Sequence, residues 1–109
     1  MQENRVKISL LCDIYGALLT EKQRDMLRLF YDYDNSLSEI AQQFSITRQG
    51  VFDSINKAEE ALINFENALK LLEKREKITA CLLSIKEDIK DNNADIVKNL
   101  ETISKLLGE

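Results

Sequence analysis

The chain has 109 residues, a formal net charge of −4, and a composition that is 44% hydrophobic and 31% charged, as in an ordinary globular domain. It contains no histidine, two isolated cysteines and no glycine-rich phosphate loop, so we expect no catalytic residues, no metal site and no cofactor. The acidic balance also disfavours strong binding to a nucleic acid through charge alone, but it leaves room for a local basic strip.

The N-terminal third is predicted to form two helices, since the chain has no proline and its apolar residues recur at helical spacing. The first helix spans residues 3–19. The second begins after Thr20, which can cap it, and Glu21 suits the positive end of the helix dipole. Residues 1–7 lack the hydrophobic stretch of a signal peptide, and no apolar run reaches the ~18 residues of a membrane span. We therefore expect a cytoplasmic protein with no membrane insertion.

Residues 36–57 carry the pattern of a helix-turn-helix. Ser36 is the expected N-cap of the first motif helix, and Glu39, three residues later, would complete a capping box. Ser45 occupies the turn, and Thr47 can cap the second helix. The apolar residues that would form the core of the motif are Leu37, Ile40, Ala41, Phe44, Ile46, Val51 and Ile55. The caps and the periodicity agree, and together they predict a helix-turn-helix.

The second motif helix is predicted to continue beyond the helix-turn-helix. Its apolar residues alternate at spacings of four and three, the a/d pattern of a coiled coil. They are Val51, Ile55, Ala58, Leu62, Phe65, Leu69 and Leu72. Thr47 to about Lys74 would then form one helix roughly 40 Å long at ~1.5 Å per residue. A small domain cannot bury the distal half of such a helix, so we expect a dimer interface there. The residues predicted to form this interface are Leu62, Phe65, Leu69 and Leu72.

The last third is predicted to form a helical hairpin whose turn lies at Asp91-Asn92-Asn93, packed either on the long helix or on a second subunit. Its apolar positions are Ile78, Leu82, Ile85 and Ile89, followed by Ile96, Val97, Leu100, Ile103, Leu106 and Leu107. Cys12 and Cys81 also lie on apolar faces and are expected to be buried, reduced thiols. The sequence thus predicts an all-α fold with a helix-turn-helix domain over residues 1–60. Residues 61–109 would form the long-helix extension and the C-terminal hairpin.

Three stretches resemble the YlxM-like family of small bacterial helix-turn-helix proteins. They are LLCDIYGALLTEKQR at 10–24, SLSEIAQQFSITRQGVFDSI at 36–55 and ALINFENALKLLEK at 61–74. The resemblance runs from about residue 5 to residue 75 and implies a regulatory protein. The helix-turn-helix is also similar to region 4 of bacterial sigma factors, which reads promoter DNA. The family's gene tends to neighbour that of the signal recognition particle GTPase, which implies a link to that pathway. Gly50 stands where the family usually has alanine, and Asn56 where it usually has lysine.

The outer face of the second motif helix is the expected site of nucleic-acid contact. With Val51 and Ile55 toward the core, the residues predicted to bind are Thr47, Arg48, Gln49, Asn56 and Lys57. The helix start can hold a phosphate, the two amides can pair with adenine, and the lysine can attract a phosphate. Asp53 opposes this, and is either a solvated charge or a partner of Lys57. Gly50 either lets the backbone approach DNA or marks close packing.

Two functions remain open at this point. The first is a DNA-binding regulatory protein, a homodimer that binds duplex DNA weakly. The second is a protein–protein interaction module that works with signal recognition particle components, either its protein or its RNA, and not on DNA. An enzyme has no supporting group of residues in this sequence.

Overall fold

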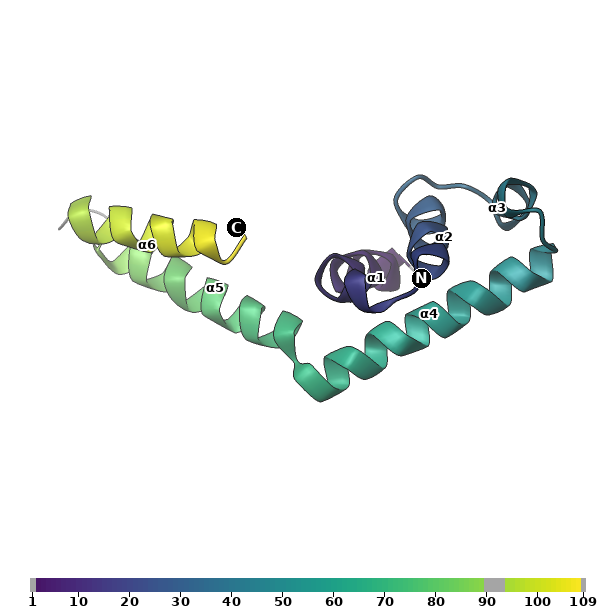
Figure 1. Ribbon diagram of the computed structural model, residues 1–109. Coiled ribbons are helices and arrows are strands. Elements are labelled where there is room, and N and C mark those ends of the chain that lie inside the picture. The colour runs from purple at the N-terminus through teal and green to yellow at the C-terminus, as the bar shows by residue number, and fades with distance from the viewer. Residues whose placement is uncertain (1, 90–93, 109) are drawn as a thin grey trace. The chain divides into compact units, whose positions relative to one another are not determined.

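The computed structural model describes residues 2–89 and 94–108, and every regular element within these ranges is helical (Figure 1). The elements are α1 (Gln2–Tyr15), the 3-10 turn η1 (Gly16–Leu18), α2 (Glu21–Tyr31), α3 (Leu37–Phe44), α4 (Arg48–Leu69), α5 (Leu71–Ile89) and α6 (Ala94–Leu106). The predicted all-α fold is confirmed. The predicted turn at 91–93 lies outside the described residues. None of the described helices is both long and apolar enough to cross a membrane.

Reciprocal side-chain caps fix where α2 and α3 begin. The Thr20 hydroxyl accepts the Gln23 backbone N–H at 3.1 Å, and the Gln23 side-chain oxygen accepts the Thr20 N–H at 3.2 Å. Ser36 and Glu39 form the same pair of bonds at 3.1 and 3.0 Å. Both N-caps are therefore where the sequence predicted them. The bond from the Thr20 N–H to Gln23, which completes the first capping box, was not predicted.

The turn between α3 and α4 rests on one residue with a left-handed backbone. Ser45 has φ of 55° and ψ of 43°, and its N–H bonds back to the last carbonyls of α3. The Ile46 N–H then bonds to the Ala41 carbonyl at 3.1 Å. Thr47 caps α4, because its hydroxyl accepts the Gly50 N–H at 3.0 Å. These bonds close the helix-turn-helix as predicted.

Residues 1–70 and residues 71–109 form two separate compact units. In the first unit, α1, α2 and α3 all pack on α4, as Figure 1 shows. The buried side of α4 consists of Val51, Ile55, Ala58 and Leu62. The large side chains that meet it without solvent exposure include Leu11, Tyr15, Met26, Leu27 and Ile40. Each such side chain contributes about 1.5–3 kcal/mol through its burial, so this unit has a real core.

The long helix ends earlier than predicted. α4 stops at Leu69, Lys70 has a left-handed backbone with φ of 55°, and α5 begins at Leu71. The prediction of one helix to about Lys74 is wrong. It rested on apolar periodicity, which continues past Lys70 even though the helix is interrupted there. The two compact units accordingly divide at residue 70 and not at residue 60.

In the second unit, α5 and α6 pack against each other as a hairpin. Leu72 and Leu82 are its buried hydrophobic residues, each 7% exposed. Arg75 donates to the Gly108 carbonyl at 3.3 Å, which ties the start of α5 to the end of the described chain. Cys81 is exposed, whereas Cys12 in the first unit is buried. The prediction for Cys81 was wrong because it lies ~100° around the helix from buried Leu82.

Candidate nucleic-acid interface

The first half of α4 presents polar side chains to solvent. Thr47, Arg48, Gln49, Asn56 and Lys57 are all exposed, while the core residues between them are buried. Helical spacing places Gln49, Asn56 and Lys57 on the side of α4 away from its core, and Thr47 and Arg48 lie at the start of the helix. They are accessible to a ligand approaching α4 from outside the core.

The start of α4 offers hydrogen-bond donors, although the Thr47 hydroxyl oxygen already accepts one hydrogen bond from the backbone. Thr47 accepts the Gly50 N–H, so its O–H remains as a donor for a phosphate oxygen. The backbone N–H groups of Arg48 and Gln49 lie in the first turn, where N–H groups have no acceptor within the helix. A Cβ at Gly50 would lie 3.1 Å from the Thr47 hydroxyl and 3.6 Å from the Ile46 side chain. The structure therefore favours close packing as the reason for this glycine.

Asp53 is paired, but not with the predicted partner. The Gln49 side-chain N–H donates to the Asp53 carboxylate at 3.0 Å. No ion pair of Lys57 with Asp53 occurs among the described residues, which leaves the ammonium group for a phosphate. An exposed ion pair gains only about 0–1 kcal/mol, so water competes well for a lysine in this setting. The sequence already held the signal for the observed pair, because an amide and a carboxylate four apart share a helix face.

The charges at the start and on the outer face of α4 cancel in number. Arg48 and Lys57 are basic, Asp53 is acidic, and Glu60 follows Asp53 two turns further along on the same side of the helix. Phe52 lies on the flank and is 47% exposed. This face can therefore offer hydrogen bonds and two positive charges, but it lacks the strongly positive field of a large basic repressor.

Two tyrosines anchor the inner side of α4 to the helices beneath it. The Tyr31 hydroxyl of α2 donates to the Glu59 carboxylate, and the Tyr15 hydroxyl of α1 donates to Glu66 at 2.7 Å. Burial, followed by the bond to Glu59, raises the pKa of Tyr31 well above its usual range. The Tyr15 ring also lies 5.9 Å from that of Phe65. Neither hydrogen bond has a local sequence signal, because its partners lie far apart along the chain.

Arg5 joins α1 to the end of α2 below Tyr31. Its guanidinium donates to the Phe30 and Tyr31 carbonyls at 3.3 and 3.2 Å, and forms an ion pair with Asp34. The same group lies 5.9 Å from the centre of the Tyr31 ring. A cation at these last carbonyls also suits the negative end of the α2 dipole. These contacts link α1 and α2, the two helices that pack on this part of α4.

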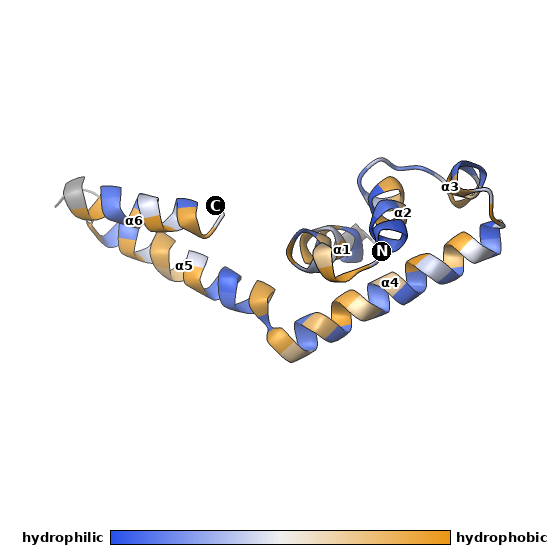
Figure 2. Cartoon of the chain, viewed as in Figure 1, coloured by the Kyte–Doolittle hydropathy of each residue, from blue (hydrophilic) through white to orange (hydrophobic). Residues whose placement is uncertain are grey.

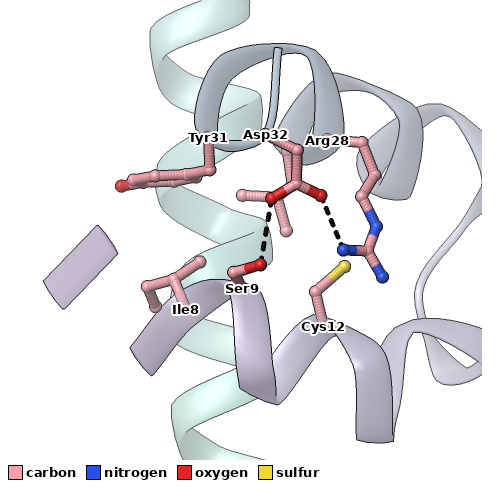
Figure 3. A pocket seen from close by; sticks show the side chains of 7 residues that line it. Ile8, Ser9, Cys12, Arg28, Tyr31 and Asp32 are labelled. Atoms are coloured by element: carbon pink, nitrogen blue, oxygen red, sulfur yellow. Dashed lines mark hydrogen bonds and ion pairs between the residues drawn. The ribbon is translucent and has the colours of Figure 1, made fainter. Parts of the chain in front are cut away.

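A second polar cluster lies between α1 and α2, where Figure 3 shows Asp32 bonded to Ser9 and to Arg28. Arg28 bridges Asp32 at 2.7 Å and Asp13 at 2.6 Å. Burial raises the pKa of the Cys12 thiol beside them, so it stays protonated and is a poor nucleophile. The hollow has no enclosed space for a ligand. We interpret this cluster as a structural link between the two helices.

The described residues hold no group of three or more histidine, cysteine, aspartate or glutamate side chains that could bind a metal ion.

The predicted dimer interface does not form one exposed stripe. Leu62 is fully buried in the first unit, and Phe65 is half-buried beside Tyr15. Leu69 is 46% exposed at the end of α4, and Leu72 is only 7% exposed on α5. Leu62 was wrongly assigned, because α1 and α2 already cover the part of α4 that carries it. Periodicity identified the apolar face correctly, but it could not tell which chain would cover it.

Exposed apolar side chains occur in both units, and in the shorter second unit they lie along both helices. In Figure 2, hydrophobic residues recur between hydrophilic ones along both α5 and α6. Those that the structure leaves exposed are Leu71, Ile78, Leu83, Ile85, Ile96, Ile103 and Leu106. A two-helix hairpin can bury only the sides that its helices turn toward each other. The remaining sides are available to a partner.

The sequence matches known proteins over nearly its whole length. Residues 2–105 match the family described as "Putative helix-turn-helix protein, YlxM / p13 like". A UPF0122 protein of Clostridium kluyveri is 41% identical over 104 residues, which cover 95% of this chain and 92% of the relative. One from Clostridium acetobutylicum is 46% identical over 89 residues, covering 82% and 73%. One from Thermoanaerobacter is 37% identical over 114 residues, covering 100% and 97%. The likeness thus extends past residue 75, where the recognised motifs ended.

Proposed function

Because the chain belongs to the YlxM/p13-like family of helix-turn-helix proteins, we propose that it is a non-enzymatic regulatory protein that binds duplex DNA weakly through α4. The observation that carries the proposal is the accessible polar surface at the start of α4, which is the second helix of a capped helix-turn-helix. We further propose that it acts in the cytoplasm, where bacterial DNA lies.

The five residues take three roles in this proposal. The N-terminal turn of α4 enters the major groove, as the second helix of such motifs does. Thr47 and Arg48 contact phosphates at the edge of the groove, together with the free N–H groups of the first turn. Gln49 and Asn56 reach base edges, where their amides can read adenine. Lys57 attracts a further phosphate and carries no base information.

The same charges predict that binding is weak and that its salt dependence is shallow. The net charge is −4, and only Arg48 and Lys57 are basic on the outer face. Each phosphate contact contributes ~0.9 to the slope of log affinity against log salt. With these two side chains and the helix start, the slope should be about 2–4 per subunit.

A second copy of the chain is the partner we propose for the apolar residues of α5 and α6. A small domain rarely leaves so many apolar side chains in water. A two-fold dimer would cover them and would present two copies of α4 to DNA. The interface then lies mainly on exposed residues of α5 and α6 such as Ile78, Ile85 and Ile103.

A salt-dependent titration of the purified protein against random-sequence duplex DNA tests the proposal. We expect binding at low salt with the shallow slope given above, and Lys57→Ala should weaken it about equally for all sequences. Lys22→Ala is the matched control, because Lys22 is exposed at the start of α2, outside the helix-turn-helix. A steep slope near that of a large basic repressor would contradict the proposed surface.

The alternative is a protein-interaction module, and the exposed apolar residues of the second unit favour it. An absence of duplex binding at low salt would decide for this alternative. A specific link to the signal recognition particle finds no support in these residues or in the names of the relatives, so it is not part of the proposal.

A further inference from the structure

Gln49 and Asp53 form a hydrogen-bonded pair on the face of α4 that we assign to DNA. The Gln49 amide nitrogen donates to Asp53 at 3.0 Å, and both side chains are exposed. A negative charge is unfavourable on a surface that meets phosphates. If the proposed function holds, this aspartate needs a role that offsets the repulsion.

The chemistry of the pair fixes the orientation of the amide. An ionised carboxylate can only accept hydrogen bonds, so the NH2 group of Gln49 must face Asp53. The amide oxygen of Gln49 is therefore turned away from Asp53. Of the two N–H bonds on the nitrogen, one is used within the pair and the other is free.

This orientation matters because the bases differ in what they present in the major groove. Adenine offers a donor at N6 beside an acceptor at N7, and cytosine offers a donor at N4. Guanine offers two acceptors, and thymine offers an acceptor and a methyl group. A Gln49 oxygen held outward can accept from adenine N6 while the free N–H donates to N7. The second oxygen of Asp53 would repel the acceptors of guanine.

We propose that Asp53 is a positioning residue that holds the Gln49 amide in one orientation, so that α4 selects adenine over guanine at one base pair. The inference rests on the proposed function and deepens it. Without Asp53, the amide can turn over and donate to guanine O6 or N7, and the selection is lost. Asp53 thus lowers affinity for every duplex in return for discrimination at one position.

Selection from a randomised duplex library tests this inference with four proteins: wild type, Asp53→Ala, Asp53→Glu and Glu60→Ala. The wild type should prefer adenine to guanine about tenfold at one position, as expected for a well-oriented amide. Asp53→Ala should bind the whole library more tightly, but its preference should fall to about twofold. Asp53→Glu keeps an acceptor within reach of Gln49 and should restore most of the preference.

Glu60→Ala is the control for charge alone. Glu60 is exposed and lies two turns from Asp53 on the same face, so its removal should tighten binding without changing base preference. An unchanged adenine preference in Asp53→Ala would overturn the inference while leaving the proposed function standing. A wild type that binds no duplex in the library would overturn both.

A measurement on the free protein checks the pair without any DNA. The side-chain amide protons of Gln49 should change their NMR chemical shifts in Asp53→Ala and keep them in Glu60→Ala. Identical Gln49 shifts in all three proteins would show that the pair does not form in solution, and would overturn the inference at its first step. Both substitutions are at exposed positions, so the fold should be retained.

Discussion

The two units of this protein have similar apolar periodicity, but it leads to different results. In residues 1–70, three helices converge on α4, and large side chains such as Leu11, Met26 and Leu62 lose all their solvent exposure. In residues 71–109, two helices face each other and keep Leu72 and Leu82 at 7% exposure. A piece of fewer than ~40 residues rarely has a self-sufficient core. An apolar stripe on a helix is thus buried only where enough other helices pack against it.

The largest expected effect comes from truncating one buried leucine in each unit, which tests whether the first unit has the tighter core. Leu62→Ala should destabilise the protein by about 2–5 kcal/mol, because it leaves a cavity under α4. Leu82→Ala, the matched change in the hairpin, should cost less than ~2 kcal/mol, because solvent already reaches its surroundings. Urea unfolding followed by circular dichroism measures both. Equal losses would mean that the second unit has a core as tight as the first.

The next largest effect concerns the proposed dimer, which would cover the exposed apolar residues of the second unit. Ile78→Asp should raise the dissociation constant of the proposed dimer at least tenfold, since one buried isoleucine contributes ~1.5–3 kcal/mol. Val6→Asp is the control, because Val6 is an exposed apolar residue of the first unit. Sedimentation equilibrium distinguishes the two variants. A wild type that is monomeric at tens of micromolar would remove the dimer from the proposal.

A smaller effect tests the hydrogen bond by which Tyr31 of α2 is joined to Glu59 of α4 in the first unit. Tyr31→Phe removes the bond to Glu59 and should cost about 1–2 kcal/mol at neutral pH. Burial, then the bond to Glu59, raises the pKa of Tyr31 above its ordinary 10.0. A raised pKa means that the folded state retains the phenolic proton. The stability this gives is fully present below pH 10.0 and is lost as the pH rises above it.

Alkaline unfolding should therefore be less steep with pH in Tyr31→Phe than in the wild type. Tyr33→Phe serves as the control, because Tyr33 is 70% exposed and should leave the alkaline behaviour unchanged. Thermal melts between pH 8 and pH 11 provide the comparison. The same pH dependence in both variants would show that the Tyr31 hydrogen bond contributes little.

The smallest effects come from the helix starts of the first unit. Ser36→Ala should cost ~1 kcal/mol, because it removes the cap of the Glu39 N–H and one side of the capping box. Ser38→Ala, an exposed change within the same helix, should be nearly neutral. Thermal melts separate the two. A loss equal to that of Ser38→Ala would mean that α3 is held by its core contacts alone.

The sequence predicted these helix starts because caps are local chemistry. A serine or threonine followed three residues later by glutamate or glutamine is visible without any structure. The end of α4 was missed for the opposite reason, since Lys70 is neither glycine nor asparagine and gives no signal of a stop. Tyr31 and Glu59 could not be paired in advance, because their contact depends on how α2 packs on α4.

The candidate site was predictable in its composition but not in its internal pairing. Gln49, Asn56 and Lys57 are exposed on α4, since helical spacing dictates which side a residue faces, and Thr47 and Arg48 are exposed at the start of the helix. The choice of Gln49 as the partner of Asp53 was open, because Lys57 lies four residues from Asp53 on the other side and satisfies the same spacing rule.

Two of the helices in the first unit end at a residue with a left-handed backbone, and neither residue is glycine. They are Ser45 after α3 and Lys70 after α4, both with φ of 55°. A side chain in this conformation costs roughly 1–2 kcal/mol, although a short polar one loses less. Glycine would avoid that cost but would loosen the unfolded chain. The helix ends are thus where thermostability could be engineered without touching the core or the outer face of α4, and Lys70→Gly is the first change to make.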